Sequence, residues 1–305
     1  MKIRQFTHGD LDGAACALIV QYLYPCDTLN VTYCQYGAKA NSIDVNVTEF
    51  LNDVEEKKVG VDVLFITDIC PSPDVCARID AMKEMFGRVI VQDHHGTTAW
   101  AAKYDWMEHE TKNKRCGAEM LFDWSGVSDS VVGGFVDAVD AYDRWQLDSP
   151  HRARGEDLNL LYKFLGPHSF AKEFSANPPF QADRTGWTCQ LLPALRAQVD
   201  GIVRANIRDR GIHIDKQKRK YVFLPLSSSY ASEIGNSALK EYPGIDYVVM
   251  AMPGINIITM RARKLGTDVS EIAKANGGGG HAEAAGFPFP LGELLWNAVA
   301  GCLDG

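Results

Sequence analysis

The sequence lacks the features that mark several large classes of protein. Its 305 residues contain no repeat, no low-complexity segment, and no apolar run that approaches the roughly 20 residues needed to cross a bilayer. The N-terminal residues show no signal-peptide pattern. We therefore expect a cytoplasmic protein that has no membrane partner.

Paired cysteines and an excess of positive charge are also missing. The eight cysteines include no CxxC pair, which argues against a zinc ribbon or a disulfide framework and favours reduced thiols. The formal net charge of -8 excludes a protein that wraps long nucleic acids without specificity, because such proteins are basic. An acidic total still allows a local basic cleft, and some of the acids can be metal ligands.

The first hundred residues alternate between short apolar runs and amphipathic stretches. The apolar runs are rich in β-branched residues and predict buried strands at residues 3–7, 29–36, 61–67 and 89–92. The stretches between them predict helices at residues 14–24, 45–54 and 74–85. This alternation predicts an α/β domain with a parallel sheet and right-handed crossovers.

The remaining two thirds of the chain change character twice. Helices are predicted at residues 117–124, 130–142, 156–165 and 170–174, and a long helix at residues 188–210. From residue 211 onward, strands and short helices alternate again. We therefore predict a first domain at 1–185, a linker helix at 186–210, and a smaller mixed-sheet α/β domain at 211–305, with a cleft between the two domains.

Acids and imidazoles follow three of the predicted strands. His8 comes at the end of the first strand, Asp68 follows the third, and Asp93-His94-His95 follows the fourth. Ligands bind at the carboxyl ends of the strands in an open α/β sheet. Carboxylate and imidazole suit Mn²⁺, Mg²⁺ or Fe²⁺, and they also accept Zn²⁺ or Co²⁺. No cysteine accompanies them, which argues against a structural zinc site.

Two separate motifs carry a resemblance to a known family. Asp93-His94-His95, with His8-x-Asp10-x-Asp12 upstream, resembles the DHH phosphoesterase superfamily, whose members include nanoRNases, oligoribonucleases and RecJ. The segment 277–287, Gly-Gly-Gly-Gly-His-Ala-Glu-Ala-Ala-Gly-Phe, resembles the glycine-rich motif of the DHH-associated domain. The resemblance covers most of the chain. It implies a parallel-sheet DHH domain followed by a DHH-associated substrate-binding domain, and a homodimer is common in such proteins.

The resemblance also implies a metal site with two Mn²⁺ ions, with Mg²⁺ as the alternative. The implied ligands are His8, Asp10, Asp12, Asp68, His94 and Asp143. Asp68 is expected to bridge the ions, because two cations roughly 3.5–4 Å apart need a shared carboxylate between them. The assignment of Asp143 rests on its Tyr-Asp-x-Trp context, and Asp140 remains the alternative.

Further residues are assigned to catalysis and to substrate binding by the same resemblance. His95 is expected to contact the scissile phosphate or to transfer a proton, and Asp93 to orient an imidazole or to stabilise the turn. A phosphate-binding loop is expected from the glycine run, since glycines leave backbone N–H groups accessible. Its implied contacts are Gly278, Gly279, Gly280, His281 and Arg261, with Arg263 as a weaker choice.

Four functions are compatible with these residues. The preferred one is a divalent-metal-dependent phosphodiesterase that hydrolyses short oligonucleotides or linear dinucleotides to mononucleotides. The others are a single-strand exonuclease of RecJ type, a phosphoesterase acting on cyclic dinucleotides or nucleotide bisphosphates, and a non-catalytic nucleotide-binding module. The complete set of predicted ligands argues against the last.

Overall fold

The computed structural model describes residues 1–25, 28–37, 40–57, 59–110, 114–176, 179–226, 230–263, 266–290 and 292–294. The chain divides into two compact units, residues 1–192 and 193–305. The division falls within α7 (Gly186–Ile207), the helix predicted as a linker. The predicted boundaries and the roles assigned to the two domains stay a prediction.

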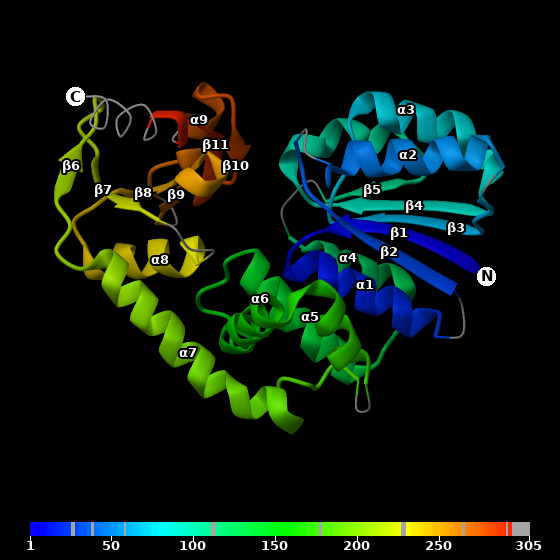
Figure 1. Cartoon of the computed structure of the whole chain (residues 1–305), viewed down its shortest axis with the longest axis horizontal. Coiled ribbons are helices and arrows are strands. Elements are labelled where there is room, and N and C mark those ends of the chain that lie inside the picture. The colour runs from blue at the N-terminus through cyan, green and yellow to red at the C-terminus, as the bar shows by residue number, and fades with distance from the viewer. Residues whose placement is uncertain are drawn as a thin grey trace, which may run out of the picture. The chain divides into compact units, whose positions relative to one another are not determined.

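The first unit is built on a parallel sheet of five strands (Figure 1). The strands are β1 (Lys2–His8), β2 (Thr28–Cys34), β3 (Val63–Thr67), β4 (Arg88–Asp93) and β5 (Met107–His109). Their order is β2-β1-β3-β4-β5, and every pair is parallel. The next strand in the chain after β1, which is β2, therefore lies on one side of β1, and β3, β4 and β5 follow one another on its other side. This switch point between β1 and β3 is where α/β sheets place their ligand sites.

Helices cover both faces of this sheet. α2 (Ile43–Glu55) and α3 (Pro73–Met82) lie on one face, and α1 (Leu11–Leu23) and α4 (Gly117–Ser125) lie on the other (Figure 1). α5 (Ser130–Asp143) and α6 (Arg152–Ser175) pack against α1, and two 3₁₀ helices, η1 (Lys83–Met85) and η2 (Gly96–Lys103), flank β4. Because both faces are covered, a central strand such as β3 is buried along its whole length.

The first unit departs from the sequence-based expectation in two places. Between the predicted strand at 89–92 and the predicted helix at 117–124, where no element was predicted, the short strand β5 adds a fifth strand to the sheet. α6 contains both helices that were predicted separately, and its two helical segments meet at Gly166, whose φ of 74° precedes Pro167. A left-handed glycine followed by proline is a strong local helix breaker, so the kink follows from the sequence.

The second unit carries a mixed sheet, as predicted. Its strands are β6 (Ile212–Ile214), β7 (Lys220–Pro225), β8 (Tyr247–Met252), β9 (Ile257–Ala262), β10 (Gly279–Gly280) and β11 (Ala284–Pro288). Their order is β10-β11-β9-β8-β7-β6, and the pair β7–β8 is parallel among antiparallel neighbours. α8 (Ala231–Glu241), α9 (Val269–Ala275) and the 3₁₀ helix η3 (Pro253–Ile255) connect the strands.

The glycine run of the second unit does not form the open loop that the sequence suggested. Gly279 and Gly280 form β10, which pairs with Gly286 and Ala285 of β11. A Cβ on Gly278 would lie 2.1 Å from the carbonyl oxygen of Gly286, and Gly280 has a φ of 134°. The expectation of an open loop is therefore wrong, because these positions are glycine so that two backbone segments can approach closely.

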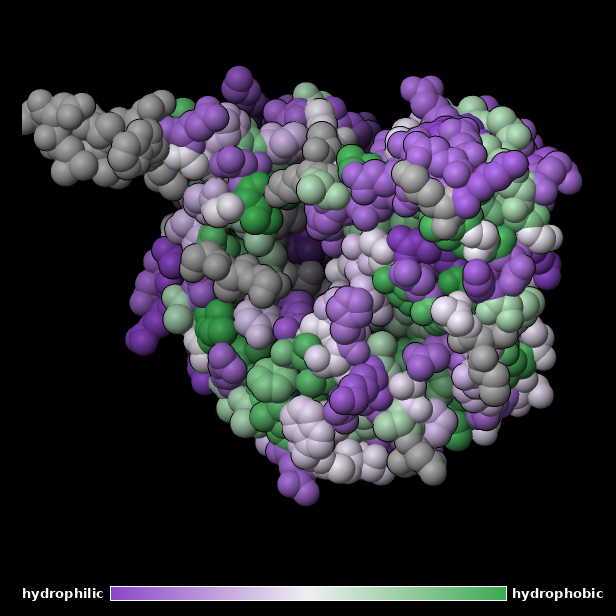
Figure 2. Space-filling model, turned by 45° about the vertical axis from the view of Figure 1, so that its right-hand side comes forward, coloured by the Kyte–Doolittle hydropathy of each residue, from purple (hydrophilic) through white to green (hydrophobic). Residues whose placement is uncertain are grey.

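Hydrophobic side chains on the face drawn in Figure 2 are scattered among hydrophilic ones. Single exposed apolar residues are normal on a folded protein, and only a large continuous patch marks a docking surface. None of the described helices combines the length and the apolar composition that crossing a bilayer requires.

Candidate metal centre

The strand ends of the first unit bring the predicted ligands together. His8 is the last residue of β1, Asp68 directly follows β3, and His94 directly follows β4. Asp10 is the N-cap of α1, where its side chain accepts a hydrogen bond from the amide of Gly13. Since β1, β3 and β4 are neighbours in the sheet, their carboxyl ends form one edge at the switch point.

All six predicted ligands belong to overlapping groups of donor atoms. Within each group, the donor atoms lie within 4.8 Å of one another. The groups found among the described residues are His8, Asp10 and Asp68; Asp12, His94 and Asp143; and Asp68, His94 and His95. Each of the six predicted ligands is in at least one of these groups, and their assignment to metal ions stays a prediction.

Asp68 lies between the two halves of this cluster. Its Oδ1 is 3.2 Å from Nε2 of His94, and its Oδ2 is 3.7 Å from Nδ1 of His8. His8 Nδ1 in turn lies 2.7 Å from Oδ2 of Asp10. Asp68 is 1% exposed, and its φ of 59° is a left-handed conformation that Asp and Asn tolerate better than other non-glycine residues.

His94 is the centre of the other half. Its Nε2 lies 3.7 Å from Oδ2 of Asp12 and 3.5 Å from Oδ2 of Asp143. Asp12 is in the first turn of α1, and Asp143 is the last residue of α5. The cluster therefore joins two helices to the strand ends.

The two alternatives at the end of α5 have different surroundings. The carboxylate of Asp140 accepts hydrogen bonds from the backbone amide of Cys116, from the guanidinium of Arg144 and from the amide of Gln146. Asp143 instead faces His94. Asp140 thus belongs to a structural ion pair, and Asp143 is the acid that lies in the cluster.

Asp12 has a second role that the sequence did not reveal. Its Oδ2 accepts a hydrogen bond of 2.7 Å from the amide of Gly117, and its Oδ1 accepts one of 2.8 Å from the amide of Ala118. These amides are the first two of α4, and a helix N-terminus stabilises a negative charge. No local sequence pattern indicates this contact, because Asp12 and Gly117 are 105 residues apart in the chain.

Gly117 is tightly confined by the same arrangement. A Cβ at this position would lie 2.7 Å from Cβ of Asp68 and 3.1 Å from Oδ2 of Asp12. Real Cβ atoms essentially never show contacts as short as the first of these. The absence of a side chain at Gly117 therefore lets α4 begin against both acids.

His95 is held by Asp93 rather than by the cluster alone. Oδ1 of Asp93 lies 2.7 Å from Nδ1 of His95, and Oδ2 accepts a hydrogen bond from the hydroxyl of Thr98. Asp93 is fully buried, whereas the His95 side chain is 26% exposed. A buried carboxylate on Nδ1 fixes the orientation of the ring, so Asp93 has the position expected of an orienting residue.

Tyr36 is an aromatic neighbour that sequence reasoning missed. Its ring centroid lies 6.0 Å from that of His8 and 5.8 Å from that of His95. Its hydroxyl accepts a hydrogen bond from the amide of Cys70, and the residue is 43% exposed. Tyr36 was predicted as the last residue of a strand, but β2 ends at Cys34, and Tyr36 lies beyond it beside the imidazoles.

The buried acids repel one another in the absence of a cation. Burial and the charges of Asp68 and Asp143 raise the pKa of Asp12 well above its usual range. Burial is also the main reason that the pKa of Asp143 rises to about 6. Burial opposes ionisation of Asp68 as well, but the nearby imidazoles of His8 and His94 hold the pKa of Asp68 well below its usual value.

These surroundings fit a divalent cation. Asp68 Oδ2 is buried and has no hydrogen-bond partner among the described residues, so a lone pair remains available there. Several carboxylates packed out of water are costly unless a positive charge compensates them. Oxygen and imidazole donors without thiolate are the set preferred by Mn²⁺ and Mg²⁺.

The residues predicted to bind substrate lie in the second unit. Arg261 is on β9 opposite Ala284 of β11, and His281 lies in the β10–β11 turn, where its amide donates to the carbonyl of Ala284. The Arg261 guanidinium donates to Thr259, Met260 and Ser232. The β9–β11 pairing thus brings Arg261 and the glycine hairpin to one end of the sheet.

Arg263, the weaker choice, has a structural function. Its guanidinium donates to the backbone carbonyls of Leu239 and Tyr242, at the C-terminus of α8. Cations at a helix C-terminus satisfy its last carbonyls and its negative dipole. This engagement argues against Arg263 as the phosphate contact.

Comparisons with known proteins agree with this description. No family model matches the chain. The oligoribonuclease NrnB of Bacillus subtilis is 25% identical over 297 residues, which cover 92% of this chain and 71% of NrnB. Among solved structures, the DHH domain of a member of a family of ribosomal proteins has a TM-score of 0.63 at 13% identity, and the match covers 99% of this chain and 86% of that one.

Two further solved structures have the same fold. The pGpG-specific phosphodiesterase PggH from Vibrio cholerae has a TM-score of 0.52 at 16% identity, covering 99% of this chain and 97% of PggH. RecJ from Thermus thermophilus in complex with Mn²⁺ has a TM-score of 0.52 at 17% identity, covering 98% of this chain and 51% of RecJ. The chain is thus similar in sequence to an oligoribonuclease, and it shares its fold with solved structures that include a DHH domain.

Proposed function

We propose that the protein is a divalent-metal-dependent phosphodiesterase that hydrolyses short oligonucleotides or linear dinucleotides to mononucleotides. The observation that carries this proposal is the position of Asp68 between His8 and His94, with Asp10, Asp12 and Asp143 around them. The named relatives supply the substrate class, since NrnB is an oligoribonuclease and PggH is specific for pGpG.

We infer that His8 and Asp10 hold one ion, that Asp12, His94 and Asp143 hold a second, and that Asp68 contacts both. Divalent ions bound there neutralise charge on the phosphoryl oxygens and make water a better nucleophile. Mn²⁺ is the preferred ion and Mg²⁺ the alternative, as RecJ structures with either ion suggest.

The protein's own contribution beside the ions comes from His95. When Nδ1 of His95 donates to Asp93, Nε2 is left to accept a proton from the attacking water. When the ring carries both protons, Nε2–H donates to a phosphate oxygen instead. Burial lowers the pKa of His95, but the charge of Asp93 and its hydrogen bond outweigh burial and leave that pKa raised.

The substrate's terminal phosphate is assigned to the second unit. We expect Arg261, His281 and the backbone of Gly278, Gly279 and Gly280 to contact it. Arg261 offers a planar guanidinium suited to phosphate. Side chains do not fit at Gly278 or Gly280, so any contact there is made by the backbone. The amide of Gly278 already donates to the carbonyl of Ala273 and is therefore not the donor to phosphate.

A turnover panel tests the proposal. Purified protein is stripped with a chelator, reloaded with Mn²⁺ or Mg²⁺, and offered dinucleotides, five-mers, long single strands, cyclic dinucleotides and nucleotide bisphosphates. We expect the highest kcat/KM on dinucleotides and five-mers with Mn²⁺. Highest activity on long strands would favour a RecJ-type exonuclease, and turnover that is independent of metal would contradict the mechanism. Sedimentation of the same sample tests the expected homodimer.

A further inference from the structure

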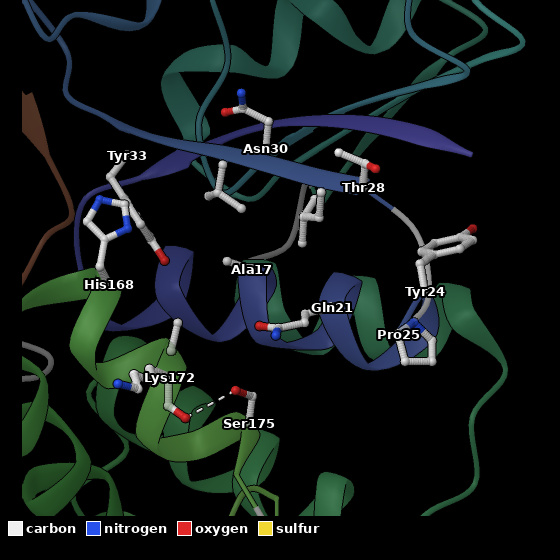
Figure 3. A pocket seen from close by; sticks show the side chains of 13 residues that line it. Ala17, Gln21, Tyr24, Pro25, Thr28, Asn30, Tyr33, His168, Lys172 and Ser175 are labelled. Carbon is white, nitrogen blue, oxygen red and sulfur yellow. Dashed lines mark hydrogen bonds between the residues drawn. The ribbon is translucent and has the colours of Figure 1, made fainter.

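A cavity of about 620 Å³ lies in the first unit on the side of the sheet that α1 and α6 cover. Figure 3 shows its wall: β2 on one side, α1 on the second, and α6 on the third. Tyr33 and His168 lie together at one end, and Tyr24, Pro25 and Thr28 lie at the other. None of the six predicted metal ligands lines it. We call this cavity the β2 groove.

The side chains that line the β2 groove suit a ligand that carries negative charge and aromatic rings. Its polar side chains include Gln21, His168, Lys172 and Ser175, and its aromatic side chains include Tyr33 and Tyr24. No carboxylate is among the residues that line it, although the chain as a whole carries a formal net charge of -8. Such a concentration of donors and aromatic rings suits a phosphate backbone and its bases.

Lys172 gives the β2 groove its positive charge. The residue is exposed, and among the described residues no carboxylate forms an ion pair with its ammonium group. The ring of His168 meets that of Tyr33 edge-on at a centroid distance of 5.4 Å. Unpaired cations beside aromatic rings are the elements of single-strand binding surfaces.

One end of the β2 groove lies beside the metal centre. Tyr33 is one residue before Cys34, which pairs with His8 in the β1–β2 register. From Tyr33 to Thr28 the strand extends about 17 Å at ~3.3 Å per residue, the length of about five stacked nucleotides.

We propose that the β2 groove binds the part of a single-stranded oligonucleotide that extends away from the metal centre, and that it raises turnover of substrates longer than a dinucleotide. The inference rests on the proposed function, since it assigns a subsite to the same reaction. Lys172 and His168 contact phosphates, and Tyr33 offers its ring to a base. A dinucleotide is too short to use the groove, so its turnover is independent of these residues.

Two variants with matched controls test the β2 groove. Lys172→Ala removes its charge, and Lys103→Ala removes an exposed lysine from η2, which does not line the groove. Ala171→Trp fills the groove, and Ser169→Trp adds the same ring to α6 at an exposed position outside it. Each protein is assayed with Mn²⁺ on a dinucleotide and on five-mers of RNA and of DNA. Binding of labelled five-mers is measured separately in chelator.

For Lys172→Ala, we expect kcat/KM to fall about tenfold on five-mers and less than twofold on the dinucleotide, with a salt slope smaller by about 0.7. Ala171→Trp should cause a larger loss on five-mers, and both controls should match wild type. Equal losses on both lengths, or unchanged five-mer kinetics and binding, would overturn the proposal. If wild type cleaves no oligonucleotide but its five-mer binding weakens with Lys172→Ala, the groove stands and the proposed function fails.

Discussion

The amide nitrogen of Gly117 lies 2.7 Å from Oδ2 of Asp12, and this contact couples the candidate metal centre to the start of α4. Asp12 is fully buried, so the two N-terminal amides of α4 replace part of the water that the carboxylate lost on folding. The same hydrogen bonds fix the direction in which the remaining lone pairs of Asp12 face. A change at Gly117 should therefore be felt at the metal ions.

Gly117→Ala is the first test of this coupling. The added methyl group would collide with Cβ of Asp68, and the shift needed to relieve the clash moves both acids. We expect Mn²⁺ affinity, measured by calorimetry, to fall at least about tenfold, and the free energy of unfolding to fall by about 1–3 kcal/mol.

Gly134→Ala provides the control for that substitution. Gly134 is in the middle of α5, and the nearest atom to a Cβ there is Nη1 of Arg154 at 3.9 Å. Alanine in an unstrained helix interior should stabilise the protein by up to about 1 kcal/mol and leave Mn²⁺ affinity unchanged. Equal behaviour of the two alanine variants would show that Gly117 has no special connection to the metal centre.

Asp68→Asn tests the bridging carboxylate. Asparagine tolerates the left-handed backbone of Asp68, so the fold should persist while one negative charge is lost between the two halves of the cluster. We expect kcat on a dinucleotide to fall more than about 100-fold, with an unchanged circular dichroism spectrum. Asp137→Asn, at an exposed position on α5, should retain full activity. Wild-type turnover by the Asp68 variant would remove the bridging role.

The two acids at the end of α5 should respond in opposite ways to replacement by alanine. Asp143→Ala removes a carboxylate that faces the buried Asp12 and Asp68, so in chelator the variant should be more stable than wild type while its Mn²⁺ affinity falls. Asp140→Ala removes the nearer of the two acids that face Arg144, the other being Glu119 at 3.9 Å, so it should lose about 3 kcal/mol of stability. Its loss of metal affinity should be small. Urea unfolding in chelator and Mn²⁺ titration separate the two cases.

The sequence predicted the elements of the first unit because its strands are short apolar runs with clear boundaries. The position of Asp68 or His94 at a strand end follows from that pattern together with the parallel sheet, so the gathering of these residues was predictable. The choice between Asp143 and Asp140 was not, because a three-residue spacing places both on one edge of α5. It is decided by the surroundings of Asp140, which pairs with Arg144 four residues along the chain and accepts a hydrogen bond from the amide of Cys116.

Contacts between segments far apart in the chain explain the remaining differences. Gly117 and Asp12 are 105 residues apart, and no local pattern indicates that a helix start will meet a helical acid. The glycines at 278–280 read as a flexible loop, since the approach of β11 depends on strand pairing that sequence periodicity does not show. The β2 groove likewise needs α6 beside β2, a packing choice made by the whole fold.

Asp93→Asn tests the support of His95. The amide keeps the size of the side chain but no longer favours the protonated, correctly oriented ring. We expect kcat to fall about 10–100-fold with little change in KM, because substrate is held by the ions and by the second unit. Thr98→Val, which removes only the hydroxyl that donates to Asp93, should cost less. A variant that raises KM and leaves kcat intact would point to a binding role for His95 instead.

Glu119 gives a dependence of stability on pH that is separate from the metal ligands. Burial and the adjacent Asp140 raise the pKa of Glu119 to about 8, from an ordinary value of 4.5. Between these two values the folded protein retains a proton that the unfolded chain has released, so the free energy of unfolding falls as pH rises through this window.

Glu119→Gln tests this dependence. The variant has no titrating proton at this position, so its free energy of unfolding should fall less as pH rises. The measurement is urea unfolding in chelator at pH 5 and pH 8, compared as the difference between variant and wild type, so that the titration of the metal ligands cancels. Glu49→Gln, an exposed change on α2, should keep the wild-type slope, and an unaltered slope in Glu119→Gln would show that Asp140 and Glu119 share no proton.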